Sequence, residues 1–263
     1  MFRALYTAAS GMEAQQTNLD NIANNLSNAS TAGFRKRRVQ FEDLMYQNVV
    51  VPGSAATQQT TVAAGLQIGL GTRSAATEMI QTQGDFNETG NPLDLTIKGQ
   101  GFFQVRTSNG ETAFTRAGAF HPDAQGNMVT ADGDALDPAI TIPADALTVT
   151  IGADGTVTVT QPGQTAAQQV GSIQLAMFTN PGGLNSIGKN LFTATSSSGD
   201  PVVGTPGGSE GLGTILQGSL EQSNVNVVEE FIQMILAQRS YEANSRVVRA
   251  ADDMFQQLNS LAR

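Results

Sequence analysis

Residues 223–263 read SNVNVVEEFIQMILAQRSYEANSRVVRAADDMFQQLNSLAR, and this stretch decides the fold. Asn226 can cap a helix, and Glu229 lies three residues later, where a capping-box acid belongs. No Gly or Pro interrupts the run from Val227 to Ala262. At about 1.5 Å per residue this run predicts a helix of roughly 54 Å, longer than most globular domains need. Apolar side chains in its second half follow coiled-coil spacing and predict a seam that needs a partner: Val247, Ala251, Met254, Leu258 and Leu261.

A second stripe with the same spacing lies in the first thirty residues and is the candidate partner. It predicts a helix that ends near Asn28–Gly33, where Ser, Asn, Thr and Gly cluster. We expect the two terminal helices to pair with each other and with neighbouring copies; the alternative is a helix pair buried within one domain. The seam positions are Leu5, Ala8, Met12, Gln15, Leu19, Ile22 and Leu26, of which polar Gln15 tends to fix register.

The middle of the chain changes to the two-residue period of β-strands from Leu93 onward. Leu93, Leu95 and Ile97 alternate with polar residues and predict a half-buried strand. Asp154-Gly155 separates two alternating segments and predicts a hairpin. Further strands are expected at Phe102–Val105, around Phe114 and Phe120, at Met128–Thr130 and at Ile173–Phe178, whereas residues 196–213 should form an exposed loop.

Two segments near the N-terminus are distinguished by their composition. Residues 35–38 form a basic run beside two acids, which favours a solvated or inter-subunit charge pair over a nucleic-acid patch. Residues 46–72 are rich in Gln, Thr, Ala and Gly without clear periodicity and predict a linker or extended loop. The fold class is therefore mainly β with long terminal α-helices that form a coiled-coil inner domain. The expected parts are an inner domain of residues 1–30 and 225–263, an extended linker of 31–75, and a β-rich outer domain of 76–224.

The charge is unevenly distributed. The net charge is −9, but residues 1–45 and 225–263 balance nine basic against nine acidic side chains. Residues 46–224 carry 5 basic and 14 acidic ones. Neutral ends suit dense packing, whereas an acidic middle stays solvated and repels anionic partners, so nucleic acid is not expected as a ligand.

Residue counts and spacings disfavour an enzyme. The chain has no Cys and one His, His121, so zinc sites built from these residues and a catalytic triad are not expected. Asp132, Asp134 and Asp137 lack the Gly and terminal Glu of a calcium loop and fit acidic turns better. The glycines at 65–71 and 99–101 match neither a P-loop nor a dinucleotide fingerprint. We expect no catalytic, cofactor-binding or metal site.

The sequence is expected to contain neither a membrane helix nor a cleaved signal peptide. No run approaches the ~18 apolar residues of a membrane helix. Glu13, Gln15, Gln16 and Asp20 fall where the apolar core of a cleaved signal peptide should lie. Export would then need a machine that accepts an uncleaved, amphipathic terminus.

Both ends and much of the middle resemble the flagellar rod and hook family of axial proteins. The N-terminal stretch is similar to the family's signature at 10–12, 19–20, 22–26, 31 and 33–34, which includes Asn24, Asn25 and Leu26. The C-terminal stretch is similar at 223–226, 234–235, 237–239, 241–242 and 244–245. Residues 93–95, 99–103 and 115–118 resemble motifs that the family shares in its β-region.

Within this family, two features resemble the distal rod and not the hook or the proximal rod. The length suits a rod, because hook proteins are usually much longer. Residues 46–72 resemble a rod-specific stretch, here marked by Tyr46, Pro52, Gln58, Gln59, Thr60, Thr61, Gly65 and Leu66. Residues 138–144 and 151–155 also favour the distal rod over the proximal rod.

The resemblance implies a structural subunit that polymerises head-to-tail into a rigid helical tube, with the terminal helices inside and the β-rich part outside. It implies a place in the basal body, in the rod that spans the periplasm, and export without a cleaved signal peptide. Implied partners are further copies of the chain, proximal rod proteins, the hook or hook–rod junction, the surrounding periplasmic and outer-membrane rings, and the flagellar type III export apparatus. The assembly contacts are expected at Leu5, Met12, Leu19, Ile22, Asn24, Asn25, Leu26 and the C-terminal seam.

The same residues leave two alternative functions open. A proximal rod or hook subunit is the closest, and residues 46–72 argue against it. A monomeric β-rich binding module, with the terminal helices as a stalk, is a different class of function. Paired apolar seams at both extreme ends favour self-assembly over such a module.

Overall fold

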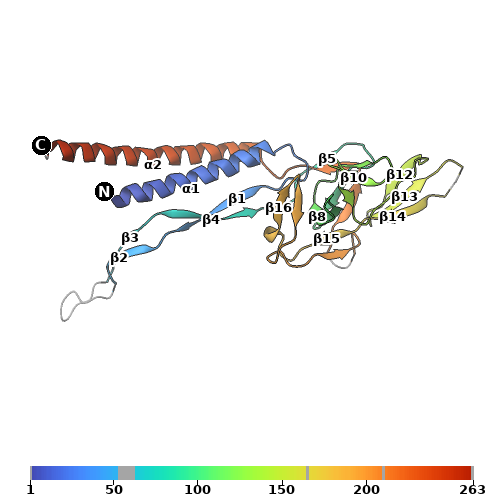
Figure 1. Cartoon of the computed structure of the whole chain (residues 1–263), viewed down its shortest axis with the longest axis horizontal. Coiled ribbons are helices and arrows are strands. Elements are labelled where there is room, and N and C mark those ends of the chain that lie inside the picture. The colour runs from blue at the N-terminus through green and yellow to red at the C-terminus, as the bar shows by residue number, and fades with distance from the viewer. Residues whose placement is uncertain (1, 53–62, 164–165, 209–210, 262–263) are drawn as a thin grey trace. The chain divides into compact units, whose positions relative to one another are not determined.

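A computed structural model describes residues 2–52, 63–163, 166–208 and 211–261. It contains two compact units (Figure 1). The first unit takes in residues 1–27, 37–78 and 226–263, and the second takes in 28–36 and 79–225. The chain therefore crosses between the units four times, and each unit is described by itself below.

Two long helices dominate the first unit, and they confirm the predicted termini. α1 spans Phe2–Ser27 and α2 spans Val227–Leu261. The Asn226 side chain caps α2, since its Oδ1 accepts hydrogen bonds from the backbone N–H of Val228 (3.1 Å) and Glu229 (3.3 Å). Among the described residues, no helix combines the length and hydropathy that a membrane span requires.

A β-ribbon completes the first unit, and it corrects one expectation. β1 (Arg37–Asp43) pairs with β4 (Thr72–Met79), and β2 (Tyr46–Val50) pairs antiparallel with β3 (Leu66–Gly69). The expectation of a linker or loop over residues 46–72 was wrong at both of its ends. Strand pairing needs only the backbone N–H and C=O groups, so it can form where the side chains do not alternate between apolar and polar. Such strands are not detected by hydrophobic periodicity. Residues 53–62 lie outside the described residues.

The second unit is built almost entirely from short strands, with one 3-10 turn at Pro181–Gly183. Its strands are β5 (Phe86–Glu88), β6 (Leu95–Lys98), β7 (Phe102–Arg106), β8 (Thr112–Thr115), β9 (Phe120–Pro122), β10 (Met128–Thr130), β11 (Ala135–Leu136), β12 (Thr148–Ile151), β13 (Thr156–Thr160), β14 (Gln168–Ser172), β15 (Leu175–Met177), β16 (Asn185–Gly188), β17 (Leu191–Thr193), β18 (Val202–Gly204), β19 (Thr214–Gln217) and β20 (Ser219–Glu221).

Strand β7 is the centre of the main sheet of this unit. The strand order is β16-β17-β8-β7-β11-β10-β9, and β15 also pairs with β7 and with β18. Smaller sheets hold β12-β13-β14, β6 with β19, and β5 with β20. The last two pairings join strands more than a hundred residues apart in sequence, so the segment just before α2 closes the unit.

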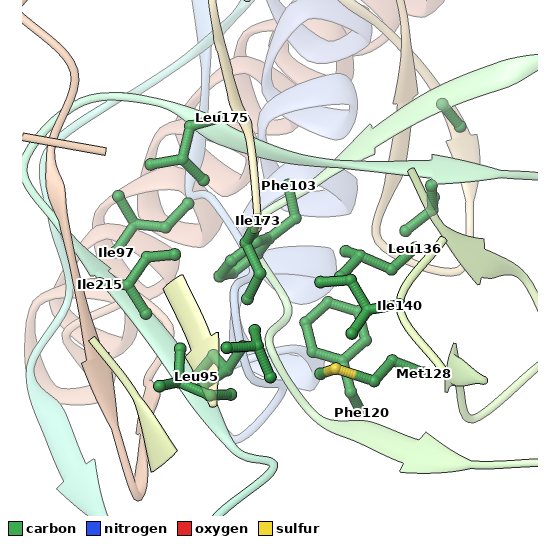
Figure 2. Close-up of a cluster of buried hydrophobic side chains, with 14 of the residues drawn as sticks. Leu95, Ile97, Phe103, Phe120, Met128, Leu136, Ile140, Ile173, Leu175 and Ile215 are labelled. Carbon is green, nitrogen blue, oxygen red and sulfur yellow. The ribbon is translucent and has the colours of Figure 1, made fainter. Parts of the chain in front are cut away.

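The two faces of β7 explain why this unit has two apolar clusters. Phe103 is fully buried in the larger cluster, where its ring contacts that of Phe120 edge to face at 5.3 Å (Figure 2). Phe102, the next residue, points to the other face and packs with Phe178 and Phe192. Successive side chains of a strand alternate between faces, so both faces of β7 are covered.

Most strands expected from the sequence are present, including those at Phe102–Val105, Phe114, Phe120, Met128–Thr130 and Leu175–Met177. The Asp154-Gly155 hairpin is confirmed by the pairing of Val149 with Val159 across β12 and β13. The Asp154 carboxylate accepts hydrogen bonds from the backbone N–H and hydroxyl of Thr156, which lowers the pKa of Asp154.

Two expectations about burial were wrong. The strand at 93–97 is not half-buried, because Asp94 and Thr96 are buried as well as Leu95 and Ile97. The Thr96 hydroxyl donates to the Ser219 carbonyl at 2.8 Å, which satisfies it inside the unit. Residues 196–213 are not simply an exposed loop either, since they contain β18 and bury Ser198 and Leu212.

Gly118 lies where the chain before β9 passes against β6. A Cβ built on this residue would lie 1.7 Å from the carbonyl oxygen of Leu95. That oxygen is a backbone atom, so it cannot move aside as the end of a flexible side chain could. The Leu95 N–H also donates to the Gly118 carbonyl at 2.9 Å, which holds the two segments together. Only glycine fits this close approach.

Replacing Gly118 with alanine should therefore destabilise the second unit. The expected loss is about 3 kcal/mol of unfolding free energy, because backbone atoms must separate to admit the methyl group. Thermal unfolding followed by circular dichroism in the β region measures it.

Gly182→Ala is the matched control. A Cβ at Gly182 would have its nearest neighbour at an ordinary 3.4 Å, the Asn180 Oδ1. Equal melting temperatures for the two variants would contradict the role assigned to Gly118.

Candidate assembly interface

Helices α1 and α2 lie side by side and run antiparallel (Figure 1). Three contacts set the register from one end to the other. The Asn25 Nδ2 donates to Glu230 Oε2 at 3.1 Å. Gly11 lies so close to α2 that a Cβ there would be 2.7 Å from the Asn244 Nδ2. The rings of Phe2 and Phe255 are 5.4 Å apart.

The predicted seam of α1 agrees with burial in the structure. Ala8 and Ile22 are buried, and the other five seam residues, Leu5, Met12, Gln15, Leu19 and Leu26, are half-buried. Asn24, which was also expected to contribute to assembly, is exposed. The helix is thus covered along its predicted stripe within the chain itself.

The predicted seam of α2 coincides only in part with the side of the helix that is covered by the rest of its unit. Ala251 is buried as expected, but Val247 and Met254 are each 46% exposed. The covered residues shift by one position, to Val248 and Phe255. α2 is apolar on more than one face, so hydrophobicity alone does not tell which face meets α1. The side chains of Leu258 and Leu261 lie outside the described residues.

Asn25 is the polar centre of the pair. It is 1% exposed, and its side chain mimics a backbone partner for β1: Oδ1 accepts from the Arg37 N–H at 3.0 Å and Nδ2 donates to the Arg37 carbonyl at 2.8 Å. Nδ2 also donates to Glu230, which is 2% exposed. One side chain therefore joins α1, β1 and α2, and a buried amide satisfied in this way fixes position better than apolar contact does.

The β-ribbon is held to α1 a second time near its middle. The Thr72 N–H donates to the Ser10 hydroxyl at 3.4 Å. Gly71 has a φ of +121°, and a Cβ there would lie 2.2 Å from the Ser10 Oγ. The small residues at 10 and 71 therefore allow the ribbon backbone to lie directly on the helix.

A groove of about 500 Å³ lies between α1, β3 and α2. Arg3, Ala4 and Thr7 line it from α1, together with Ile68 of β3 and Val247 of α2. The predicted seam residue Val247 therefore lines this groove, where it stays 46% exposed.

The first three turns of α2 carry a continuous apolar stripe that nothing described in the chain covers. Its members are 48% to 67% exposed, although each is a large apolar side chain. Their spacing of three and four residues puts them on one side of the helix. We call them the α2 stripe: Val228, Phe231, Ile232, Ile235 and Leu236.

The β2–β3 ribbon and the residue before it also expose apolar groups. Tyr46 and Leu66 are 52% and 54% exposed on the β2–β3 ribbon, and Met45 is 84% exposed. A hydrogen bond to Asp43 raises the pKa of the Tyr46 phenol. Gly65 lies against Pro52, where a Cβ would approach the ring to 2.5 Å. Gln58, Gln59, Thr60 and Thr61 lie outside the described residues.

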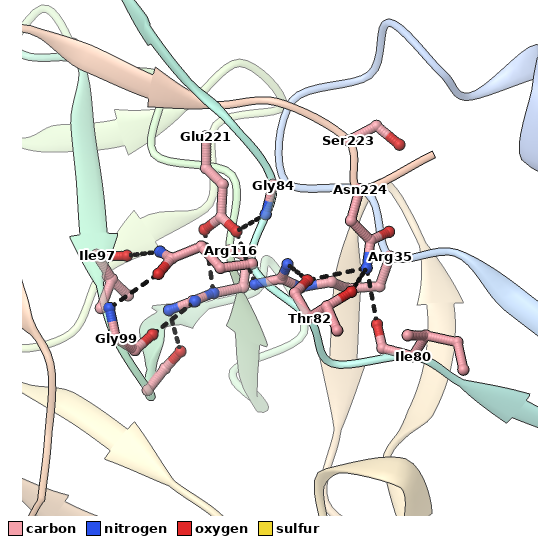
Figure 3. Close-up of polar contacts among 12 residues, drawn as sticks. Arg35, Ile80, Thr82, Gly84, Ile97, Gly99, Arg116, Glu221, Ser223 and Asn224 are labelled. Carbon is pink, nitrogen blue, oxygen red and sulfur yellow. Dashed lines mark hydrogen bonds and ion pairs between the residues drawn. The ribbon is translucent and has the colours of Figure 1, made fainter. Parts of the chain in front are cut away.

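Inside the second unit, a buried ionic network corrects the expectation of a solvated basic run (Figure 3). Arg35 and Glu221 have side chains only 2% and 1% exposed, and their closest N–O distance is 2.8 Å. Arg116 contacts the same carboxylate at 3.3 Å. Burial lowers the pKa of Arg35 and lowers that of Arg116 to about 10. Guanidinium groups stay protonated in proteins at neutral pH, so both side chains are cations. Arg38, by contrast, does form an exposed pair with Glu78.

Asn224 is a further residue whose role the sequence did not reveal. Its Oδ1 accepts from the Lys36 N–H at 2.6 Å, and its Nδ2 donates to the carbonyls of Ile80 (3.0 Å) and Thr82 (2.9 Å) (Figure 3). It therefore ties three distant segments together just before α2 begins. Its position in the C-terminal signature was the available signal.

His121, Asp132 and Asp137 take part in strand pairing or in ion pairs. His121 is exposed on β9 and pairs with Val129. Asp137 forms an ion pair with Arg106 at 3.2 Å, and Asp132 forms one with Lys189 at 3.5 Å. Among the described residues, no group of three acidic or histidine side chains is placed to hold a metal ion.

Replacing Asn25 with alanine should loosen the helix pair. We expect a loss of about 3 kcal/mol of unfolding free energy, because the Arg37 peptide and Glu230 each lose a buried partner. Denaturant unfolding followed by helix circular dichroism measures this loss. Asn18→Ala, a half-buried asparagine of the same helix, is the control and should change stability by less than about 1 kcal/mol.

Asn25→Asp makes the same contact testable by pH. A second carboxylate beside Glu230 raises the pKa of the pair in the folded state above its unfolded value. Stability is then lost as pH rises, so this variant should be less stable at pH 7 than at pH 5 relative to wild type, whereas Asn25→Ala should show no such difference. A pH-independent effect of the aspartate would contradict the contact.

Comparisons with known proteins cover the same parts of the chain. Residues 5–35 match the family model of flagella basal body rod proteins. Residues 96–159 match that of the flagellar hook protein FlgE/F/G D1 domain, and residues 216–261 match that of the flagellar basal body rod FlgEFG protein C-terminal region.

Full-length relatives agree with these matches. The chain is 44% identical to the flagellar basal-body rod protein FlgG of Borreliella burgdorferi over 265 residues, which covers 100% of both chains. It is 45% identical to FlgG of Caulobacter vibrioides, covering 98% of this chain and 99% of that one. With FlgG of Bacillus subtilis the identity is 39% over 100% of both chains. The chain belongs to the FlgG family of flagellar basal-body rod proteins.

Proposed function

We propose that the chain is a structural subunit of the distal flagellar rod, in the part of the basal body that spans the periplasm. Copies polymerise into a rigid helical tube that transmits torque from the motor to the hook. Family membership supports the rod. The α2 stripe is the observation that carries the assembly mechanism, because a long helix with a bare apolar side gains stability when another copy covers it.

The size of the stripe is sufficient to drive assembly. Each of its five side chains is about half exposed. Covering the exposed half of five such side chains stabilises a contact by roughly 4–7 kcal/mol before the entropy cost of association. In a polymer every subunit makes this contact with its neighbours, so the contributions accumulate along the tube.

The partner of the stripe is a second copy that presents a different surface. A contact between two different surfaces does not close into a dimer and extends into a helical array. The groove between α1, β3 and α2 is the surface we assign to it, because small and apolar groups line that groove: Ala4, Ala8, Ile68, Gly69 and Val247. The expected seam residues Val247 and Met254 are exposed and available to such a contact.

Rigidity follows from how the helix pair is fixed within each copy. Asn25 joins α1, β1 and α2 through hydrogen bonds to the Arg37 peptide and to Glu230. A shaft that transmits torque must resist sliding of its helices, and directional bonds at a buried site resist sliding better than an apolar seam.

The β2–β3 ribbon has the role of a bridge between subunits. Met45, Tyr46 and Leu66 expose apolar surface on a ribbon of two strands, which is marginal when isolated in water. Contact with a neighbouring copy would bury these groups. Residues 46–72 therefore stiffen the tube in this proposal.

The remaining partners come from the position of the rod. The chain would contact proximal rod proteins on one side and the hook or hook–rod junction on the other, and it would reach its place through the flagellar type III export apparatus. The acidic residues of 46–224 would face the surrounding periplasmic and outer-membrane rings, where like charge limits adhesion during rotation.

Placing a charge in the α2 stripe should prevent polymerisation without unfolding the chain. Ile232→Lys puts a cation in a contact that must lose water, so tube formation on concentration should fall at least tenfold. Sedimentation and negative-stain electron microscopy measure it. Helical content in dilute solution should stay unchanged, because Ile232 is 53% exposed.

Gln233→Lys is the matched control, since Gln233 is exposed on the same helix and lies about 100° around the helix axis from Ile232, off the stripe. It should polymerise like wild type. Tubes of normal length from Ile232→Lys would overturn the assignment of the stripe.

Removing the ribbon tests its role as a bridge. Deletion of residues 47–70 should leave both units folded, because Leu44 and Gly71 already meet through a 2.9 Å hydrogen bond that a two-residue turn of Met45 and Tyr46 can close. The tubes should become curved, with a shorter persistence length in electron micrographs. Tubes as straight as those of the full chain would show that the ribbon does not stiffen them.

A further inference from the structure

The second unit contains a partly open cavity of about 370 Å³ that the assembly mechanism does not use. Arg35 and Arg116 line one part of it, and Gln81, Gln83 and Gln100 add polar groups. The apolar wall is formed by Phe102, Met177 and Phe178.

The charges beside this cavity do not balance. Arg35 and Arg116 are 3% and 4% exposed, and both guanidinium groups share the single carboxylate of Glu221. The described residues that line the cavity include no acid. Two buried cations against one anion leave a surplus of one positive charge, which is costly in a medium of low dielectric constant.

The donors of the two guanidinium groups are unequally satisfied. Arg116 donates to the carbonyls of Gly101 and Gly99, each at 2.8 Å, and Arg35 donates to the Thr82 carbonyl (Figure 3). The Arg35 Nε, however, is buried without a hydrogen-bond partner among the described residues, and so is the Oε2 of Glu221, which contacts Arg116 only as an ion pair. The unused buried donor therefore belongs to the same pair of guanidinium groups that carries the surplus charge.

We propose that this cavity binds an organic carboxylate. One negative charge matches the surplus, and a carboxylate oxygen can accept from a guanidinium N–H. The apolar part of the ligand would lie along Phe102, Met177 and Phe178, a surface that inorganic anions cannot use. The carboxylate can come from a free small acid or from an acidic side chain of another copy, and the two sources share this chemistry.

Benzoate is the probe for the site itself. It should raise the melting temperature of the dilute full-length chain by about 4 °C when its free concentration is ten times Kd. Sodium chloride and sodium sulfate at matched ionic strength control for general salt effects. No difference between benzoate and chloride would overturn the proposal.

Gln81→Glu provides the second test, because it places a carboxylate in the wall of the cavity without changing side-chain size. This variant should melt at a higher temperature than wild type and should no longer respond to benzoate. Gln169→Glu adds the same charge at an exposed position on β14 and should keep the wild-type response. Destabilisation by Gln81→Glu together with an unchanged benzoate response would contradict the site.

Titration of assembled tubes distinguishes the two sources. If tubes bind benzoate as the dilute chain does, the natural ligand is a free acid. If tubes exclude benzoate or dissociate in it, a neighbouring copy supplies the carboxylate, an outcome that rests on the proposed polymerisation. The benzoate response of the dilute chain does not rest on polymerisation. A chain that binds benzoate but forms no tubes would therefore contradict the proposed function and leave the binding site standing.

Discussion

The contact of Asn25 with Glu230 and the Arg37 peptide is the constraint on which the first unit depends. The two helices come from opposite ends of the chain, and their apolar seams alone would tolerate a slip of one turn. A buried amide that must meet both a carboxylate on α2 and a peptide on β1 permits one register. With that register set, Gly11 meets Asn244 and Phe2 meets Phe255, and the β-ribbon lies on α1 at Ser10.

A fixed helix pair also determines what remains available for assembly. Because α1 covers the side of α2 that carries Ala237 and Ala251, the side with Ile232 and Ile235 stays bare. The second unit is stabilised separately, by apolar clusters on both faces of β7 and by the Arg35–Glu221–Arg116 network. Assembly through the helices and stability of the β-rich unit therefore rest on different residues, and each can be changed without the other.

Much of this arrangement was predictable from the sequence, and the exceptions have physical reasons. Helix limits followed from the cap at Asn226 and from the absence of Gly and Pro, and the hairpin followed from Asp154-Gly155. The predicted seam of α2 is one residue away from the covered one, because the helix is apolar on two sides. Val247 and Val248 are equally good candidates for the seam by hydrophobicity. Arg35 was expected to be solvated because its neighbours are charged, but its partner Glu221 lies far away in sequence. Long-range pairing of this kind leaves no local pattern.

The central claim is that the bare side of α2 becomes an interface between copies. The chain contains no cysteine, so Ile232→Cys and, off the stripe, Gln233→Cys each give a single site for a nitroxide label. Electron paramagnetic resonance then reports how freely each label moves before and after polymerisation. We predict that both labels are mobile in dilute protein, and that only the label at 232 becomes immobilised in tubes. A label at 232 that stays as mobile in tubes as in dilute solution would contradict the account.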